Sequence, residues 1–228
     1  MTQHVALLGH PVEHSLSPKM QNAAFTALGL DWEYEARDVE DVLAAVADLR
    51  AAGFAGANVT IPYKQEVVAA VDVADGEAVN TLVFRDGHVL GFNTDKEILG
   101  GIDATRACVI GAGGAALALA PGLPADTRVF TRSGEWPPDA DGCDLIVNAT
   151  PVRNVLLVEP HAGQTVVDLA YSIDDAGETA LIVAARAAGC VVIDGREALV
   201  RQGAKSFELW TRMVAPADVM RAAVRPGI

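Results

Sequence analysis

A glycine-rich turn directly after a short apolar run constrains the fold of this chain more than any other feature. The run Cys108-Val-Ile continues as Gly111-Ala-Gly113-Gly114-Ala-Ala116, which has the spacing Gly-x-Gly-x-x-Ala. In a strand–turn–helix unit the first glycine permits a tight turn, the second lets the backbone approach a pyrophosphate, and a small third residue allows close packing. The N–H groups that open the helix then favour an anion. The strand context favours a dinucleotide site over the alternative, a glycine-rich turn without a ligand.

Short β-branched runs alternate with amphipathic helical segments around this turn. In the second half of the chain the predicted strands are Ala107–Ile110, Arg128–Thr131, Leu145–Val147, Thr165–Asp168 and Val191–Ile193. Short apolar strands of this kind are typical of buried parallel sheets. We expect one helix over Thr179–Ala188 and two more within Gln202–Val224, joined around Pro216.

The first half of the chain predicts a second sheet. Its expected strands are Val5–Leu8, Trp32–Ala36, Ala57–Val59, Asn80–Arg85 and His88–Phe92. The last two flank Asp86-Gly87, which is a strong signal for a two-residue hairpin turn. The alternation of strands and helices throughout therefore predicts an α/β protein with two sheets.

Three helices are expected between these first strands. Ser17 is expected to cap a helix with Pro18 at its first position. The apolar face of the second helix is formed by Val42, Leu43, Val46 and Leu49. The third helix is expected to begin at Pro62 and to carry Lys64. We place the boundary between two domains near residues 96–102, where Gly100 and Gly101 could form a hinge.

Charge and cysteine content exclude several functional classes. Seventeen Lys and Arg against thirty Asp and Glu leave a net charge of −13, which disfavours nonspecific nucleic-acid binding. The longest nearly apolar stretch, Thr179–Ile193, is too short to span a bilayer, and Met1–Gly9 lacks the features of a signal peptide. Three cysteines without Cys-x-x-Cys spacing indicate a reducing compartment and no metal site. We therefore expect a cytoplasmic protein without membrane, nucleic-acid or metal partners.

The residues after the second strand of the dinucleotide unit indicate which cofactor binds. An NAD site usually has Asp or Glu about 20 residues beyond the first glycine, whereas this chain has Thr131, Arg132 and Ser133 there. The planar guanidinium of Arg132 suits a 2′-phosphate, and the two hydroxyl groups add hydrogen bonds. The segment predicts NADP, the alternative being that Arg132 is a solvated loop residue.

Three polar clusters lie outside the glycine turn, at His14–Pro18, Asn58–Lys64 and Asn93–Asp95. Each places hydroxyl or amide groups at the end of a strand or the start of a helix, which suits a small polyhydroxylated ligand. Each residue also has a purely structural interpretation. Ser17 and Thr60 could cap helices, Asn80 could hold a turn, and Lys64 and Asp95 could be surface charges. Their joint occurrence beside a dinucleotide motif favours function.

The order of these clusters resembles the shikimate dehydrogenase family. The motifs that carry the resemblance are Gly9-His-Pro-Val-Glu-His-Ser-Leu-Ser-Pro18, Asn58-Val-Thr-Ile-Pro-Tyr-Lys64, Ala78-Val-Asn-Thr-Leu82, Gly91-Phe-Asn-Thr-Asp95, Asp168-Leu-Ala-Tyr171, and Gly195 followed by Gln202, Phe207 and Trp210. They extend over essentially the whole chain. The resemblance implies an N-terminal α/β substrate-binding domain of residues 1–98 plus 205–228, and a Rossmann-like, doubly wound NADP-binding domain of residues 99–204.

The resemblance also implies a reaction and a substrate site. The reaction would be the NADPH-dependent reversible reduction of 3-dehydroshikimate to shikimate, by a monomer or homodimer. Ser15 and Ser17 would hold the substrate carboxylate, and Lys64 and Asp95 would be the catalytic pair. The residues around the substrate ring and its hydroxyls would be Thr60, Asn80, Tyr171 and Gln202.

The cofactor site is implied in the same way. The pyrophosphate would lie on Gly111, Ala112, Gly113, Gly114 and Ala115, and the ribose phosphate on Thr131, Arg132 and Ser133. The backbones of Leu169 and Gly195 would lie near the nicotinamide.

The sequence departs from the family in the cofactor domain. Only Arg132–Cys143 joins two predicted parallel strands, and Pro137 and Pro138 make a helix there improbable, so we expect an extended crossing. Pro121 is expected to end the helix after Ala115 early. Two alternatives therefore stay open: a related enzyme acting on quinate or an aminoshikimate, and a ligand-binding or regulatory homologue with weakened catalysis.

Overall fold

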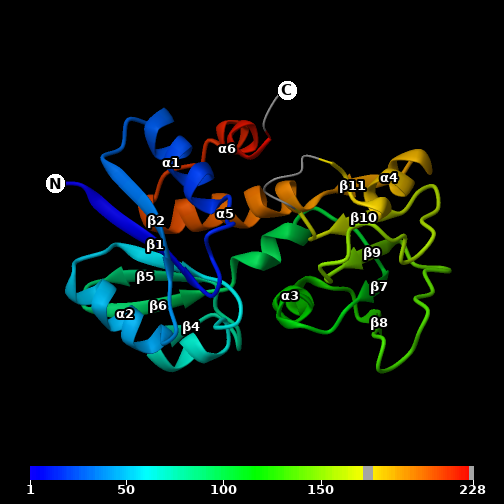
Figure 1. Ribbon diagram of the computed structural model, residues 1–228, viewed down its shortest axis with the longest axis horizontal. Helices are drawn as coiled ribbons and strands as arrows, with labels where there is room; N and C mark the ends of the chain where they lie inside the picture. The colour runs from blue at the N-terminus through cyan, green and yellow to red at the C-terminus, as the bar shows by residue number, and fades with distance from the viewer. Residues whose placement is uncertain (172–176, 226–228) are drawn as a thin grey trace. The chain divides into compact units, whose positions relative to one another are not determined.

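The structure is a computed structural model that describes residues 1–171 and 177–225. The chain forms two compact units, which Figure 1 colours by residue number. Unit 1 comprises Met1–Glu97 and Val200–Ile228, and unit 2 comprises Ile98–Leu199. In this division the chain returns to unit 1 at Val200, within the helix Gly195–Thr211.

Unit 1 contains a mixed six-stranded sheet in the order β2-β1-β3-β5-β6-β4. The strands are β1 (Gln3–Gly9), β2 (Trp32–Asp38), β3 (Gly56–Val59), β4 (Val73–Ala74), β5 (Thr81–Arg85) and β6 (His88–Phe92). Strand β1 is parallel to both β2 and β3, whereas β5 is antiparallel to β3 and β6. The hairpin turn at Asp86-Gly87 is confirmed, since Arg85 pairs with His88 and both turn residues have positive φ.

Helices cover both faces of this sheet. They are α1 (Ser17–Ala27), α2 (Val42–Ala51), α6 (Ala217–Val224), the 3₁₀ helix η1 (Glu66–Ala70) and the part of α5 (Gly195–Thr211) that belongs to unit 1. The 3₁₀ helix η2 (Thr94–Leu99) begins in unit 1 and ends in the core of unit 2 with Ile98 and Leu99. One face packs against α2 through Val42, Val46 and Leu49, whereas Leu43 is 37% exposed, contrary to the predicted apolar face. On the other face, Phe25 of α1 stacks on Phe207 of α5.

Two sequence-based predictions about helix starts are wrong. Leu16, not Ser17, is the residue that precedes α1, and Ser17 makes no capping bond. The Ser15 hydroxyl accepts from the Ser17 N–H instead, at 3.2 Å, because a serine two residues back can close a tight turn. Lys64 is not helical: it lies in the turn between β3 and η1, because the helix starts only at Glu66.

Unit 2 contains a five-stranded, fully parallel sheet in the order β11-β10-β9-β7-β8. The strands are β7 (Arg106–Ile110), β8 (Asp126–Phe130), β9 (Leu145–Asn148), β10 (Thr165–Asp168) and β11 (Val191–Ile193), with helices α3 (Gly114–Leu119), η3 (Ala120–Gly122) and α4 (Ala180–Ala187). The strand order reverses at β7, since β8 lies on one side of it and β9 on the other. The predicted α/β fold class is confirmed.

Two of the connections in unit 2 carry no helix. Residues 131–144 and 149–164, all of them described, cross between strands without one, so the predicted extended crossing is confirmed. Ala140, Cys143 and Val158 from these connections pack with Leu181 of α4 against one face of the sheet. Loop side chains therefore bury apolar surface that a crossover helix usually buries. Helix α3 has only six residues before η3, as Pro121 predicts.

The described residues lack two kinds of feature, a membrane-spanning helix and a cluster of metal ligands. Within residues 1–171 and 177–225, none of the helices is long and apolar enough to cross a bilayer. The same residues contain no group of three or more His, Cys, Asp or Glu placed to hold a metal ion.

Candidate active site

The topology of unit 1 brings the polar clusters to one edge of its sheet. Because β1 and β3 are parallel neighbours, with Leu8 paired to Val59, the segments after both strands begin side by side. Strand β5 runs the opposite way, so its start lies at the same edge, and so does the end of β6, where Phe92 pairs with Thr81. Four segments distant in sequence therefore meet at this edge.

A partly buried ion pair lies at this edge. Lys64 Nζ lies 2.5 Å from Asp95 Oδ2, and the two side chains are only 17% and 11% exposed. The backbone of Lys64 is fixed because its carbonyl accepts from Val79 N at 2.8 Å. With little water to screen the charges, the pair presents an ammonium and a carboxylate in a fixed arrangement. The structure thus brings the two predicted catalytic residues into direct contact.

Asn80 holds the carboxylate from the other side. Its Nδ2 donates to Asp95 Oδ1 at 2.9 Å, and its Oδ1 accepts from the backbone N–H of Thr94 at 2.8 Å. Asn80 is only 3% exposed. The Asp95 backbone N–H in turn donates to Asn93 Oδ1 at 3.1 Å. One carboxylate oxygen is therefore positioned by the buried Asn80 and the other by the partly buried Lys64.

A second layer of polar side chains supports Asn80. Asn58 Nδ2 lies 3.0 Å from the Asn80 carbonyl, 2.9 Å from Thr81 Oγ1 and 3.0 Å from Ser206 Oγ. Tyr34 donates its hydroxyl to Asn58 Oδ1 at 2.9 Å. No local sequence signal indicates the part played by Ser206, which reaches the network because α5 packs on the sheet.

The predicted substrate-carboxylate residues follow β1. Ser17 is buried at the start of α1, and Ser15 is bonded to its N–H. Thr60 follows the neighbouring β3, and its N–H donates to Leu8 O at 2.9 Å. A Cβ at Gly9 would lie 2.3 Å from Thr60 Cγ2, so only glycine lets the two segments approach this closely. These hydroxyl residues lie at the same sheet edge as Lys64.

Gln202 is placed by the packing of α5 on α1. The neighbouring Gly203 approaches α1 so closely that a Cβ would lie 2.2 Å from Met20 Cε. Gln21 also donates from Nε2 to Gly203 O at 2.9 Å. Gln202 thus belongs to unit 1, whereas Tyr171 follows β10 in unit 2.

The glycine turn of unit 2 has the geometry expected of a pyrophosphate cradle. Gly111 has φ +102°, and a Cβ there would lie 2.9 Å from Thr150 Cγ2 and 3.2 Å from Ala149 O. Ala112, Gly113 and Gly114 are exposed, and a Cβ at either glycine would meet nothing within 4 Å. The turn therefore presses its first glycine against the end of β9 and leaves the rest of its backbone open. These residues fit a dinucleotide.

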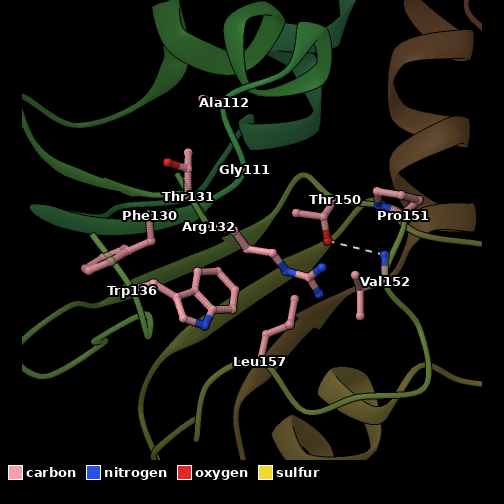
Figure 2. Close-up of a pocket in the computed structure, with 10 residues that line it drawn as sticks. All are labelled: Gly111, Ala112, Phe130, Thr131, Arg132, Trp136, Thr150, Pro151, Val152 and Leu157. Atoms are coloured by element: carbon pink, nitrogen blue, oxygen red, sulfur yellow. Dashed lines mark hydrogen bonds between the residues drawn. The ribbon is translucent and has the colours of Figure 1, made fainter. Parts of the chain in front are cut away.

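A pocket of about 320 Å³ adjoins this turn at the carboxyl ends of β7, β8 and β9. Figure 2 shows its lining: Gly111, Ala112, Phe130, Thr131, Arg132, Trp136, Thr150, Pro151, Val152 and Leu157. Ligands of open parallel sheets bind where the strand order reverses, which is the position of this pocket. Ser133 lies beside it, with Oγ 3.5 Å from Thr131 Oγ1. Four of the lining residues, Gly111, Ala112, Thr131 and Arg132, were predicted from the sequence to bind the cofactor, whereas the apolar side chains of the lining were not.

A buried carboxylate organises the neighbouring strand ends. Asp168 Oδ1 accepts from Asn148 Nδ2 at 2.9 Å and from Ala170 N at 3.0 Å, and Oδ2 accepts from Thr179 Oγ1 at 2.5 Å. Burial raises the pKa of Asp168, because desolvation outweighs these bonds. A Cβ at Gly195 would lie 2.8 Å from Leu169 O, so the two predicted nicotinamide-side residues are backbone neighbours.

An open parallel sheet with a glycine turn at its reversal point, together with a second unit that carries a partly buried Lys–Asp pair, defines a two-unit α/β protein of the dinucleotide-binding class. Two family models match: the shikimate dehydrogenase substrate binding domain over residues 7–82 and the shikimate 5′-dehydrogenase C-terminal domain over residues 195–225. The chain belongs to the shikimate dehydrogenase family, as its motifs predicted.

Relatives and solved structures match nearly the whole chain. Shikimate dehydrogenase (NADP⁺) of Moorella thermoacetica is 37% identical, covering 98% of this chain and 93% of the relative. Its counterpart in Anaeromyxobacter sp. is 38% identical, covering 97% and 95%. The crystal structure of shikimate 5-dehydrogenase from Thermus thermophilus in complex with NADP(H) and shikimate has a TM-score of 0.84 and 33% identity, covering 98% and 99%.

The chain is nevertheless short for this family. The alignment with the Moorella relative extends over 277 positions, whereas the chain has 228 residues. The relative therefore has segments that are missing here. Within unit 2, two of the connections between strands, residues 131–144 and 149–164, carry no helix.

Proposed function

We propose that this protein is an NADP-dependent shikimate dehydrogenase, which reversibly reduces 3-dehydroshikimate to shikimate in the biosynthesis of chorismate and the aromatic amino acids. The observation that carries the proposal is the Lys64–Asp95 pair at 2.5 Å, set among buried amide and hydroxyl groups. The names of the relatives, and a related structure solved with NADP(H) and shikimate, support the same activity.

Unit 1 would hold the substrate. The hydroxyl groups of Ser15 and Ser17, after β1, would donate hydrogen bonds to the substrate carboxylate. Thr60, Asn80 and Gln202 would bind the ring hydroxyls from the same unit. Tyr171 would add a further contact from unit 2. Because each group is short or held by backbone packing, the site would select a ligand of fixed shape.

Lys64 and Asp95 would manage the proton. In the reducing direction Lys64 Nζ would donate a proton to the ketone oxygen as its carbon is reduced, and in the reverse direction it would take the proton from the hydroxyl. Asp95 would hold the ammonium and accept a hydrogen bond from an adjacent substrate hydroxyl. A fixed charge that faces the developing alkoxide lowers the barrier because no reorganisation is needed at the moment of reaction.

Unit 2 would hold the cofactor. Gly111, Ala112, Gly113, Gly114 and Ala115 would bind the pyrophosphate through the open backbone of the turn. The ribose 2′-phosphate would be bound by Thr131, Arg132 and Ser133, and the nicotinamide would lie near the Leu169 and Gly195 backbones. When bound, NADPH supplies the hydride that reduces the ketone carbon.

A second candidate is a ligand-binding homologue with weakened catalysis. The specific observation behind it is the short unit 2, in which two strand connections lack helices. Catalysis requires a full cofactor site, whereas substrate binding by unit 1 does not. Binding of NADPH to the whole chain therefore separates the two candidates.

An absorbance assay tests the proposed activity. Shikimate and NADP should give an increase in absorbance near ~340 nm, the band of the reduced nicotinamide, and NAD should be used much less well. Quinate in place of shikimate tests the related-enzyme alternative. No reduction of NADP by shikimate at any pH from mildly acidic to alkaline would contradict the proposal.

The proposed setting is the cytoplasm, with small molecules as partners and a monomer or homodimer as the working form. A net charge of −13 supports the expectation that nucleic acid is not a partner, because a negative surface cannot replace its counterions. Sedimentation of the purified chain would distinguish monomer from dimer.

A further inference from the structure

The pocket beside the glycine turn has walls of an unexpected kind. Most of its lining is apolar, with Phe130, Pro151, Val152 and Leu157 contributing side chains, and Arg132 crosses it with Thr150 at its edge (Figure 2). Thr150 Oγ1 is already bonded to Val152 N at 3.3 Å and to Asn148 Oδ1 at 2.7 Å. Such a pocket suits a flat, largely apolar ring that carries an anion at its margin.

The position of the pocket connects it to the dinucleotide turn. Gly111 and Ala112 belong both to the turn and to the pocket wall. A ligand whose pyrophosphate lies on the open backbone of the turn therefore has one end within reach of this pocket. The part of NADP that combines a flat ring with a nearby phosphate is the adenosine 2′-phosphate.

Trp136 provides the broad exposed face of this pocket. It lies in the helix-free 131–144 connection and remains 41% exposed, whereas the other aromatic side chain in the lining, Phe130, is fully buried. Phe130 is also covered by Arg128, whose guanidinium lies 4.8 Å from its ring centre. The indole is therefore the aromatic face that the described pocket offers to a base.

Trp136 also lies beside Arg132, the residue expected to bind the 2′-phosphate. The Arg132 guanidinium lies 5.9 Å from the centre of the indole ring, within the range of a cation–π contact. Figure 2 shows the two side chains next to each other in the pocket. The helix-free 131–144 connection thus places an aromatic face and a cation together.

We propose that Trp136 contacts the adenine ring of the cofactor, while Arg132 beside it binds the 2′-phosphate. This inference rests on the proposed function, since it assumes that NADP is the ligand. Aromatic contact with a base does not depend on the phosphate, whereas the Arg132 contact does. Loss of Trp136 should therefore weaken adenosine ligands with or without the 2′-phosphate, whereas loss of Arg132 should weaken only those that carry it.

Calorimetric titration of the full chain with adenosine 2′,5′-bisphosphate and with AMP separates these roles without turnover. Trp136→Ala should weaken both ligands about tenfold, the scale of one lost base–aromatic contact. Arg132→Ala should weaken the bisphosphate about tenfold or more and leave AMP within about twofold. Val155→Ala is the matched control, because Val155 is 61% exposed in the other helix-free connection and does not line the pocket.

Tryptophan fluorescence gives an independent readout. The chain has three tryptophans, of which Trp32 and Trp210 belong to unit 1. Adenosine 2′,5′-bisphosphate should quench emission in the wild type and in Trp32→Phe, because the indole that contacts adenine is still present. The quenching should be lost in Trp136→Phe.

Two more variants guard against misfolding as an explanation. Trp136→Phe should keep affinity within about threefold because it retains an aromatic face, and Trp136→Leu should lose about as much as alanine. Unchanged affinity for both ligands in Trp136→Ala or Trp136→Leu would overturn the inference. So would loss of the bisphosphate alone, which would make Trp136 only a support for Arg132.

The inference and the proposed function can fail separately. If the ligand patterns hold but the protein does not oxidise shikimate with NADP, the adenine contact stands and the proposed activity is wrong. If the protein oxidises shikimate with NADP and Trp136→Ala binds both ligands normally, the proposed activity stands and the adenine contact is wrong.

Discussion

Asn80 and Asp95 are joined by a 2.9 Å hydrogen bond from the amide of one to the carboxylate of the other, and Lys64 lies 2.5 Å from the opposite carboxylate oxygen. The carboxylate is therefore held between a neutral donor and a cation. All three side chains are buried or partly buried. If one of them is removed, water does not readily replace the hydrogen-bond partner that the others lose.

Replacement of Lys64 by alanine should abolish most of the turnover. We expect Lys64→Ala to lower kcat by roughly 10²–10⁴-fold, the range for loss of a general acid–base group, and to change KM for shikimate much less. Steady-state kinetics with saturating NADP measure both constants. Equal losses in binding and turnover would contradict a role confined to the chemical step.

An exposed ion pair in the same unit provides the control for this variant. Lys96 Nζ lies 2.5 Å from Asp75 Oδ2, with side chains 42% and 50% exposed. Lys96→Ala removes the same group from a solvated pair and should leave kcat unchanged. A full-speed Lys64→Ala enzyme, or a slow Lys96→Ala enzyme, would overturn the assignment.

Asn80→Ala should affect both stability and catalysis. The change leaves Asp95 Oδ1 and the Thr94 N–H without their buried partner, which should cost about 1–3 kcal/mol of unfolding free energy. It should also lower kcat, because the carboxylate is no longer held in place. Chemical denaturation and steady-state kinetics test the two effects.

Asn22→Ala is the matched control for Asn80→Ala. Asn22 bonds both the N–H and the carbonyl of Tyr34 at 2.8 Å, so it too holds a backbone segment of unit 1. Asn22→Ala should lose about as much unfolding free energy as Asn80→Ala, and the folded variant should keep the kcat of the wild type. If both variants keep full turnover, Asn80 has only a structural role.

The glycines of the turn should respond differently to alanine. At Gly111 the positive φ and the close contact with Thr150 should destabilise the protein by about 1–3 kcal/mol. At Gly113, where φ is −80° and a Cβ would meet open space, stability should change by less than about 0.5 kcal/mol. NADP affinity of Gly113→Ala should nevertheless fall about tenfold, or roughly 1.4 kcal/mol, because the new methyl group lies on the open backbone.

Thermal unfolding and NADPH titration together check this prediction. Gly163→Ala, at an exposed position with φ +89° outside the turn, controls for strain without a ligand effect. A Gly113→Ala protein that binds NADPH as the wild type does would show that the pyrophosphate does not approach this residue.

His10 should titrate above its ordinary value. Its Nδ1 lies 2.5 Å from Asp38 Oδ1, and this hydrogen bond raises the pKa of the exposed imidazole from 6.5. A raised folded-state pKa means that His10 favours folding at pH values below 6.5, and that this contribution is lost as the pH rises through the folded value.

NMR titration of the imidazole measures this shift. Asp38→Asn should bring the pKa of His10 back towards 6.5, and Glu40→Gln should move it less, because Glu40 acts only through its more distant charge. Equal effects of the two variants would contradict the hydrogen bond as the cause.

Local signals predicted most of the fold. The Asp86-Gly87 turn formed as expected because its residues tolerate positive φ, and the five strands of unit 2 lie within about a residue or two of the predicted ranges. The predictions for Ser17 and Lys64 were wrong because their local signals for a helix start are weak. For Ser17 the signal was the following Pro18, and for Lys64 it was the preceding Pro62. The packing of α1 and of the β3–η1 turn decided their conformations.

The sequence by itself determined the α/β alternation, the glycine turn and the order of the polar motifs, because periodicity and turn chemistry act over a few residues. Only the tertiary structure decided that Lys64 meets Asp95 across 31 positions, that Ser206 supports Asn58 across 148, and that Trp136 faces a pocket. These contacts depend on strand order and on helix packing, which bring distant segments to one sheet edge. No short stretch of sequence encodes such a meeting.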